Sequence, residues 1–134
     1  MKRVLYITIL IIVLGCSGDD DTNVIIPLTG VDGVWNLINV TGGFVGTDHD
    51  FESGLITWDF EESSQTVTIT NNNTDNTLED SFPSGTYTYT IITAQGGNQE
   101  MLVDGRNIGN FELTSNQFTL DETFRDGFRF IFRR

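Results

Sequence analysis

The chain has 134 residues, with 19 acidic against 7 basic side chains and a net charge of −12 at neutral pH. Phosphates of nucleic acids and anionic lipid headgroups repel such a surface, so composition argues against nucleic-acid binding. The length fits one ordinary domain, and a single cysteine has no disulfide partner within the chain.

The first 15 residues have the features of an export signal. Lys2 and Arg3 precede an apolar run, residues 4–14, which as a helix spans only about half of a ~30 Å hydrocarbon core. The run is therefore too short for a permanent transmembrane helix. With Gly15 and Cys16 directly after it, the segment resembles a bacterial lipoprotein signal peptide. The resemblance implies cleavage before Cys16 and lipidation of its sulfur; the alternative is an ordinary secretory signal with an incidental cysteine.

Residues 16–27 are predicted to be an acidic, lipidated tether. The aspartates at 19–21 repel one another and extend the chain, and acidic runs at this place resemble surface-export signals. Ser17 stands where aspartate would suggest inner-membrane retention. We expect an outer-membrane lipoprotein on the periplasmic or cell-surface face, held by acyl chains such as palmitate. The alternative for the acidic run is a solvated spacer. Without residues 1–15, five arginines stand against 19 acids, a net charge of −14.

From residue 28 onward, apolar and polar side chains alternate with period two, which is typical of half-buried strands. Eight strands are predicted, at residues 33–41, 55–60, 66–70, 85–93, 100–103, 108–113, 117–120 and 127–133. The first is ambiguous, because Trp35 and Leu37 share one face while Val34, Ile38 and Val40 share the other. Short turn sequences such as Asp104-Gly105 join several strands. Residues 42–54 and 71–84 are expected to be long loops.

Sequential hairpins with one apolar face each predict an all-β antiparallel meander. Eight such strands can close into an up-and-down barrel, which removes the unpaired edges of an open sheet. A two-sheet β-sandwich has the same strand spacing and remains the alternative fold.

Gly33-Val34-Trp35 forms a G-x-W opening within residues 28–37. Together with residues 54–60, 66–73 and 84–89, it resembles the small lipocalin-like lipoproteins of bacteria. META-type domains begin in the same way, but their internal Gly-Cys-Asn signature is missing here. The lipocalin-like resemblance implies one barrel over residues 28–134, with Trp35 closing one end and a late basic residue packed across it.

The position of Arg134 agrees with that expectation. In an eight-stranded meander, the last strand closes antiparallel beside the first, so its C-terminal end lies next to Trp35. Counting in twos from Phe130 and Phe132 reaches Arg134, which places its guanidinium over the indole, an interaction of roughly 0.5–2 kcal/mol. The alternative is a frayed, solvated terminus.

The aromatic residues suggest a ligand site. Trp58, Tyr87, Tyr89 and Phe130 are predicted to line the interior, with the tyrosine hydroxyls and the Trp58 N–H as polar contacts for a small apolar ligand. An eight-stranded barrel is only just wide enough for its own side chains or one small ligand. A filled barrel, acting as a structural or protein-interaction module, is therefore the alternative.

Catalytic chemistry finds little support. His49 is the only histidine and lies in a predicted loop between Asp48 and Asp50, where a solvated side chain is expected. No nucleophile elbow accompanies it, and the spacing of Asp48, His49, Asp50 and Glu52 is weak grounds for a metal. We therefore predict a monomeric, membrane-anchored lipoprotein without enzymatic activity, metal or cofactor, which binds a small apolar ligand or an envelope component.

Overall fold

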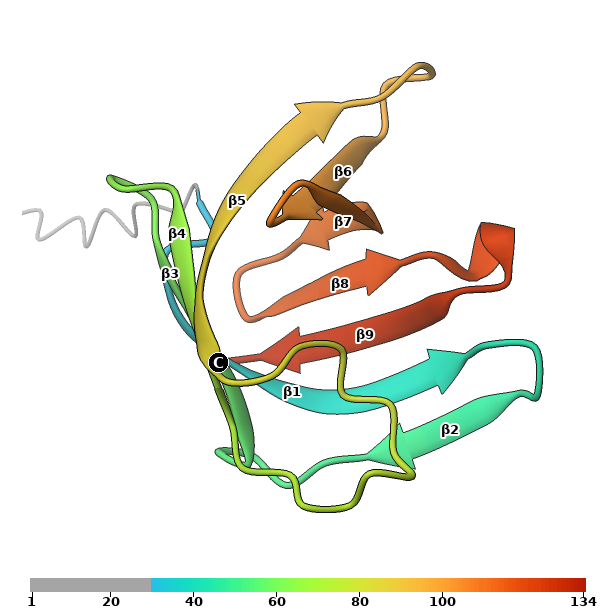
Figure 1. Ribbon diagram of the computed structural model, residues 1–134. Helices are drawn as coiled ribbons and strands as arrows, with labels where there is room; N and C mark the ends of the chain where they lie inside the picture. The colour runs from blue at the N-terminus through green and yellow to red at the C-terminus, as the bar shows by residue number, and fades with distance from the viewer. Residues whose placement is uncertain (1–29) are drawn as a thin grey trace, which may run out of the picture.

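The computed structural model describes residues 30–134, which form one antiparallel sheet that closes into a barrel (Figure 1). The strands are β1 (Gly33–Gly42), β2 (Thr47–Asp50), β3 (Ile56–Glu61), β4 (Thr66–Asn71), β5 (Gly85–Thr93), β6 (Gln99–Val103), β7 (Arg106–Leu113), β8 (Gln117–Asp121) and β9 (Phe128–Arg133). A short 3-10 helix, η1 (Thr123–Arg125), precedes β9. Neighbouring strands pair in the order β2-β1-β3-β4-β5-β6-β7-β8-β9, and β1 also pairs with β9. The predicted all-β barrel is confirmed.

The predicted signal segment, Cys16, the tether and residues 28–29 lie outside the described residues. Within residues 30–134, no helix is long and apolar enough to cross a bilayer.

The prediction that residues 42–54 form only a loop is wrong, because they contain β2. One edge of β1 pairs with β3 over Gly33–Asn36 and with β2 over Asn39–Gly42. The Thr47–Asp50 sequence has no apolar member and gives no alternation signal. The strand is stabilised instead by side-chain hydrogen bonds, because Asn39 Nδ2 donates to Asp48 Oδ1 at 3.0 Å and to Asp50 Oδ1 at 2.9 Å.

A β-bulge settles which face of β1 is buried. The pairing of β1 with β9 shifts register between Leu37 and Asn39, so the alternation restarts one residue later. Trp35, Leu37 and Val40 are therefore all buried, whereas Val34 is 51% exposed. The two apolar faces seen in the sequence are one inward face interrupted by an extra residue.

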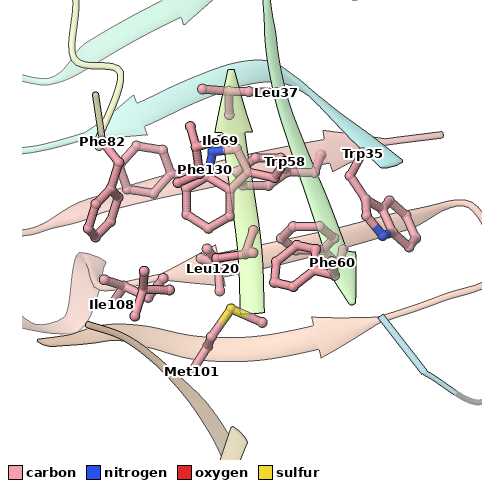
Figure 2. Packing of buried hydrophobic residues seen from close by; sticks show 14 of the residues in the cluster. Trp35, Leu37, Trp58, Phe60, Ile69, Phe82, Met101, Ile108, Leu120 and Phe130 are labelled. Atoms are coloured by element: carbon pink, nitrogen blue, oxygen red, sulfur yellow. The ribbon is translucent and has the colours of Figure 1, made fainter. Parts of the chain in front are cut away.

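Aromatic rings form the centre of the core (Figure 2). Phe118 stacks on Phe132 with ring centroids 4.3 Å apart, and Trp35 packs edge-on against Phe118 at 5.0 Å. Phe130 and Phe132 are buried, as the alternation of the last strand predicts, and Phe128 is half-buried. The apolar face of each hairpin thus supplies rings to a single interior.

The two ends of the barrel differ. The Trp35 end consists of the start of β1, the turns at 62–65 and 114–116, and Arg134. Its contacts include Glu62 N–H donating to Asp32 Oδ1 at 2.9 Å. The hairpin end consists of the β1–β2 turn at 43–46, the link 72–84, the turn at 104–105 and the segment 122–127. There Gly43 N–H donates to the Gly127 carbonyl at 2.9 Å.

Candidate functional site

At the Trp35 end, the structure places Arg134 over Trp35. The guanidinium carbon lies 4.2 Å from the ring centroid, and Arg134 Nη2 also donates to the Asp32 carbonyl. The indole Nε1 of Trp35 donates to the Val31 carbonyl at 2.6 Å, so the polar atom of this buried ring has a hydrogen-bond partner. Gly33 has a φ of +96°, a conformation that favours glycine at this place in the G-x-W sequence.

The four predicted ligand-binding residues lie along the interior rather than around one point. Trp58 and Phe130 are buried in its middle (Figure 2). The ring of Tyr87 packs on Phe82 at 5.4 Å, and its hydroxyl donates to the Pro83 carbonyl at 3.0 Å. Tyr89 instead packs on Phe60 at 5.0 Å. The two tyrosines, two residues apart on β5, therefore contact different parts of the aromatic core.

Ring contacts run through the interior from one end towards the other. They lead from Trp35 through Phe118 and Phe132 to Trp58, at 4.9 Å from Phe132, and then to Phe82, at 5.7 Å from Trp58. This packing occupies most of the width that eight strands allow. A ligand inside the barrel must therefore be small or must displace a ring.

Trp58 carries a buried polar atom without a protein partner. Its ring is completely buried, and Nε1 finds no hydrogen-bond acceptor among residues 30–134. Buried donors are nearly always paired, and leaving one unpaired costs about 1–3 kcal/mol. An acceptor supplied by a water or by a small molecule fits this position.

Phe82 covers Trp58 at the hairpin end. It is 8% exposed, lies edge-on to the indole, and has the guanidinium carbon of Arg106 5.7 Å from its own ring centroid. Phe82 is not predicted from the sequence, because residues 71–84 show no alternation of apolar and polar side chains. A single aromatic residue before proline in an Asn- and Asp-rich segment is the signal that could have identified it as a buried anchor.

The link 72–84 also lines an open polar pocket of about 310 Å³ at the hairpin end. Its polar groups largely hold the link itself, since Asn73 Nδ2 donates to Asp80 Oδ2 at 2.9 Å and Asn71 Nδ2 donates to the Phe82 carbonyl at 3.0 Å. The pocket is lined by Asn71, Asn73, Asn76, Asp80, Ser81, Pro83 and Ser84.

A second pocket, of about 270 Å³, lies towards the Trp35 end between Glu62, Gln65, Tyr89 and Ile91. Burial raises the pKa of Tyr89 to about 12, with the carboxylates of Glu62 and Asp32 adding to the shift. The Tyr89 hydroxyl, protonated at neutral pH in any case, therefore stays a hydrogen-bond donor further into the alkaline range.

The residues around His49 do not converge. His49 lies on β2 opposite Val40, not in a loop, and is half-buried on the same face of the sheet as that core residue. Asp48 and Asp50 are exposed on the other face, because successive side chains of a strand alternate. Within residues 30–134, no three His, Cys, Asp or Glu side chains form a group that could hold a metal ion.

Two buried side-chain donors among residues 30–134 lack an acceptor, Trp58 Nε1 and Arg129 Nε. The Trp58 N–H lies in the apolar interior next to Phe82, which makes it the feature best suited to orienting a small apolar molecule. Comparison of the chain with known protein families, with characterised proteins and with solved structures gives no match.

Proposed function

We propose that the chain is a lipid-anchored outer-membrane protein whose lipocalin-like barrel binds a small apolar molecule with one hydrogen-bond acceptor. It acts by binding and not by catalysis. The observation that carries the proposal is the unpartnered Nε1 of the buried Trp58. Interior donors of this kind commonly fix the orientation of a ligand that is otherwise held by apolar contacts.

The surroundings of Trp58 favour a neutral acceptor. The rings of Phe60, Phe82 and Phe132 pack against the indole, and each has its centroid within 6.0 Å of it. A carboxylate placed among these rings would lose its hydration, which is far more costly than the desolvation of a carbonyl. A ketone, ester or ether oxygen on a short apolar body is the chemistry that fits.

Entry requires Phe82 to move. The link that carries Phe82 is held to the barrel by polar contacts, among them Asn71 N–H donating to Ser84 Oγ at 2.8 Å. Hydrogen bonds at a solvent-exposed position exchange readily with water, so each contributes only about 0.5–1.5 kcal/mol. Displacement of Phe82 would open the apolar interior at the hairpin end.

The anchor is supported by the sequence. The apolar run 4–14, followed by Gly15 and Cys16, has the length and order of a lipoprotein signal. Metabolic labelling with a palmitate analogue should mark the wild-type chain and not the Cys16→Ser variant. A Cys16→Ser variant that still partitions into detergent as the wild type does would contradict the anchor.

Binding can be tested by calorimetric titration of the full lipidated chain in detergent with octan-2-one, a small apolar probe with one carbonyl oxygen. Trp58→Phe keeps an aromatic side chain, though a smaller one, and removes the N–H donor, so we expect about 3–10-fold weaker binding, the equivalent of one hydrogen bond. Trp35→Phe makes the same change at an indole whose N–H is already bonded to the Val31 carbonyl, so it is the matched control and should leave the affinity unchanged. Equal affinities for the wild type and Trp58→Phe would contradict the proposal.

A filled barrel is the second candidate, and the unbroken series of ring contacts from Trp35 to Phe82 favours it. In that case a water accepts the Trp58 N–H bond, and the protein acts through its acidic surface and loops. The filled barrel would be favoured if octan-2-one does not bind and if solvent extracts of the purified protein contain no small molecule.

A further inference from the structure

The β1–β2 hairpin ends in two apolar side chains that the fold does not bury. Phe44 is 95% exposed and Val45 is 92% exposed. Gly43 and Gly46 flank them with φ values of +68° and +74°, which turn the chain tightly and leave the two residues at the apex. Among residues 30–134, these are the most exposed of the large hydrophobic side chains.

A third exposed apolar residue lies at the same end of the barrel. Phe124, 60% exposed, belongs to η1, and the segment that contains η1 is bonded to the hairpin through Gly43 and Gly127. Figure 1 shows η1 and the β1–β2 turn projecting at one side of the barrel. We call Phe44, Val45 and Phe124 the apolar tip.

The shape and charge of the apolar tip indicate what it contacts. Phe44 and Val45 project from a narrow turn and form no groove, so a protein partner would need a preformed pocket to bury them. The interfacial region of a bilayer adapts to a projecting apolar group without such a pocket. The guanidinium of Arg125 lies 5.0 Å from the centroid of the Phe124 ring, but it is paired with Glu122, and Asp126 follows it in the chain. The charge around Phe124 is therefore not positive, and attraction to anionic lipid does not supply the affinity.

We infer that the apolar tip inserts into the surface of the lipid bilayer to which the chain is anchored, so that the hairpin end of the barrel faces the membrane. This inference rests on the proposed lipid anchor at Cys16. It goes beyond that proposal, because an anchor alone leaves the orientation of the barrel undefined.

The length of chain before the barrel permits this arrangement. Gly30 lies at the Trp35 end, where a Cβ added to it would meet the Glu62 side chain. The path from Cys16 to Gly30 covers 14 residues and reaches at most roughly 46–50 Å. The 10 residues of β1 span about 33 Å. The tether is therefore long enough to reach from the membrane past the full length of the barrel. Anchoring also raises the local concentration of the apolar tip at the membrane, so a weak intrinsic affinity of the tip is enough to keep it inserted.

The test uses the full lipidated chain on phosphatidylcholine vesicles that contain a lipid with a nitroxide quencher near the headgroup. Acylated Cys16 has no free thiol, so Val45→Cys introduces a single labelling site for an environment-sensitive fluorophore. Ser64→Cys, in the exposed β3–β4 turn at the Trp35 end, is the matched control. We expect strong quenching at position 45, little at position 64, and no effect of added salt. Adding Phe44→Ser to the Val45→Cys chain should weaken insertion about tenfold, as expected for one buried apolar side chain.

Vesicle flotation, measured on the same samples, distinguishes failure of the lipid anchor from failure of the contact between the apolar tip and the bilayer. Protein that does not float with the vesicles contradicts the anchor and this inference with it. Protein that floats while position 45 is no more quenched than position 64 overturns the contact of the apolar tip and leaves the anchor intact.

Discussion

Replacing Arg134 by alanine tests whether the end of the chain holds the barrel closed. The guanidinium lies 4.2 Å from the centroid of the buried Trp35 ring and also bonds the Asp32 carbonyl. A cation over an indole contributes about 0.5–1 kcal/mol where the cation is exposed, and a charged hydrogen bond of limited burial contributes a similar amount. We expect Arg134→Ala to lower the free energy of unfolding by about 1–2 kcal/mol, or Tm by about 5–10 °C.

Arg133→Ala is the matched control. Arg133 is the preceding residue and is also exposed, but its side-chain contact is a 3.2 Å hydrogen bond from Nε to Gln117 Oε1 at the surface, which should contribute less than about 0.5 kcal/mol. Arg134→Lys keeps the charge but loses the planar stacking, so an intermediate stability is expected. Urea denaturation of the four proteins under identical conditions supplies the measurement. Equal destabilisation by the two alanine substitutions would refute the reasoning, because the effect would then follow from loss of charge near the terminus and not from contact with Trp35.

Two further predictions concern the core and the tyrosines. Phe118→Ala removes a ring in contact with Trp35, Phe60, Phe111 and Phe132 and should lower the free energy of unfolding, measured in urea, by about 3–5 kcal/mol. Phe124→Ala at the exposed η1 should change it by less than about 0.5 kcal/mol. Similar losses for both variants would mean that Phe118 does not occupy the centre of the core. The pKa of Tyr89 is raised from 10.0 to about 12, so the folded protein holds this proton more tightly than the unfolded chain, and the associated stability should be lost as pH rises from about 10 to 12. Ultraviolet titration should show one late phenolate step that Tyr89→Phe abolishes, and a late step that persists in the variant would assign the shift to another tyrosine.

Much of the barrel was predictable because its strands carry strong alternation. Thr86, Thr88 and Thr90 separate the inward residues of β5, and the spacing from Phe130 to Arg134 placed the last residue beside Trp35. These inferences need only the period of a strand and the antiparallel closure of the last strand on the first.

The features that escaped prediction depend on contacts between distant residues. β2 has no apolar side chain and is fixed by Asn39 on the neighbouring strand. The bulge after Leu37 moves Val40 to the inward face, a shift that the period of the strand alone cannot reveal. Phe82 is buried only because the link that follows β4 passes over Trp58. That Trp58 Nε1 lacks an acceptor likewise depends on the positions of all of its neighbours, which the sequence does not give.

The pairing of β1 with β9 has a consequence for how the protein is made. Asn36 lies opposite Arg133, so the ring of strands joins residues 97 positions apart in the chain. Pairings between such remote residues form late and slowly during folding. While the chain emerges in order, β1 can pair with β2 and β3, but its other edge has no neighbour until β9 appears in the last seven residues, so the barrel stays open during that time. For the exported lipoprotein proposed above, that delay would leave the chain open for passage through a membrane.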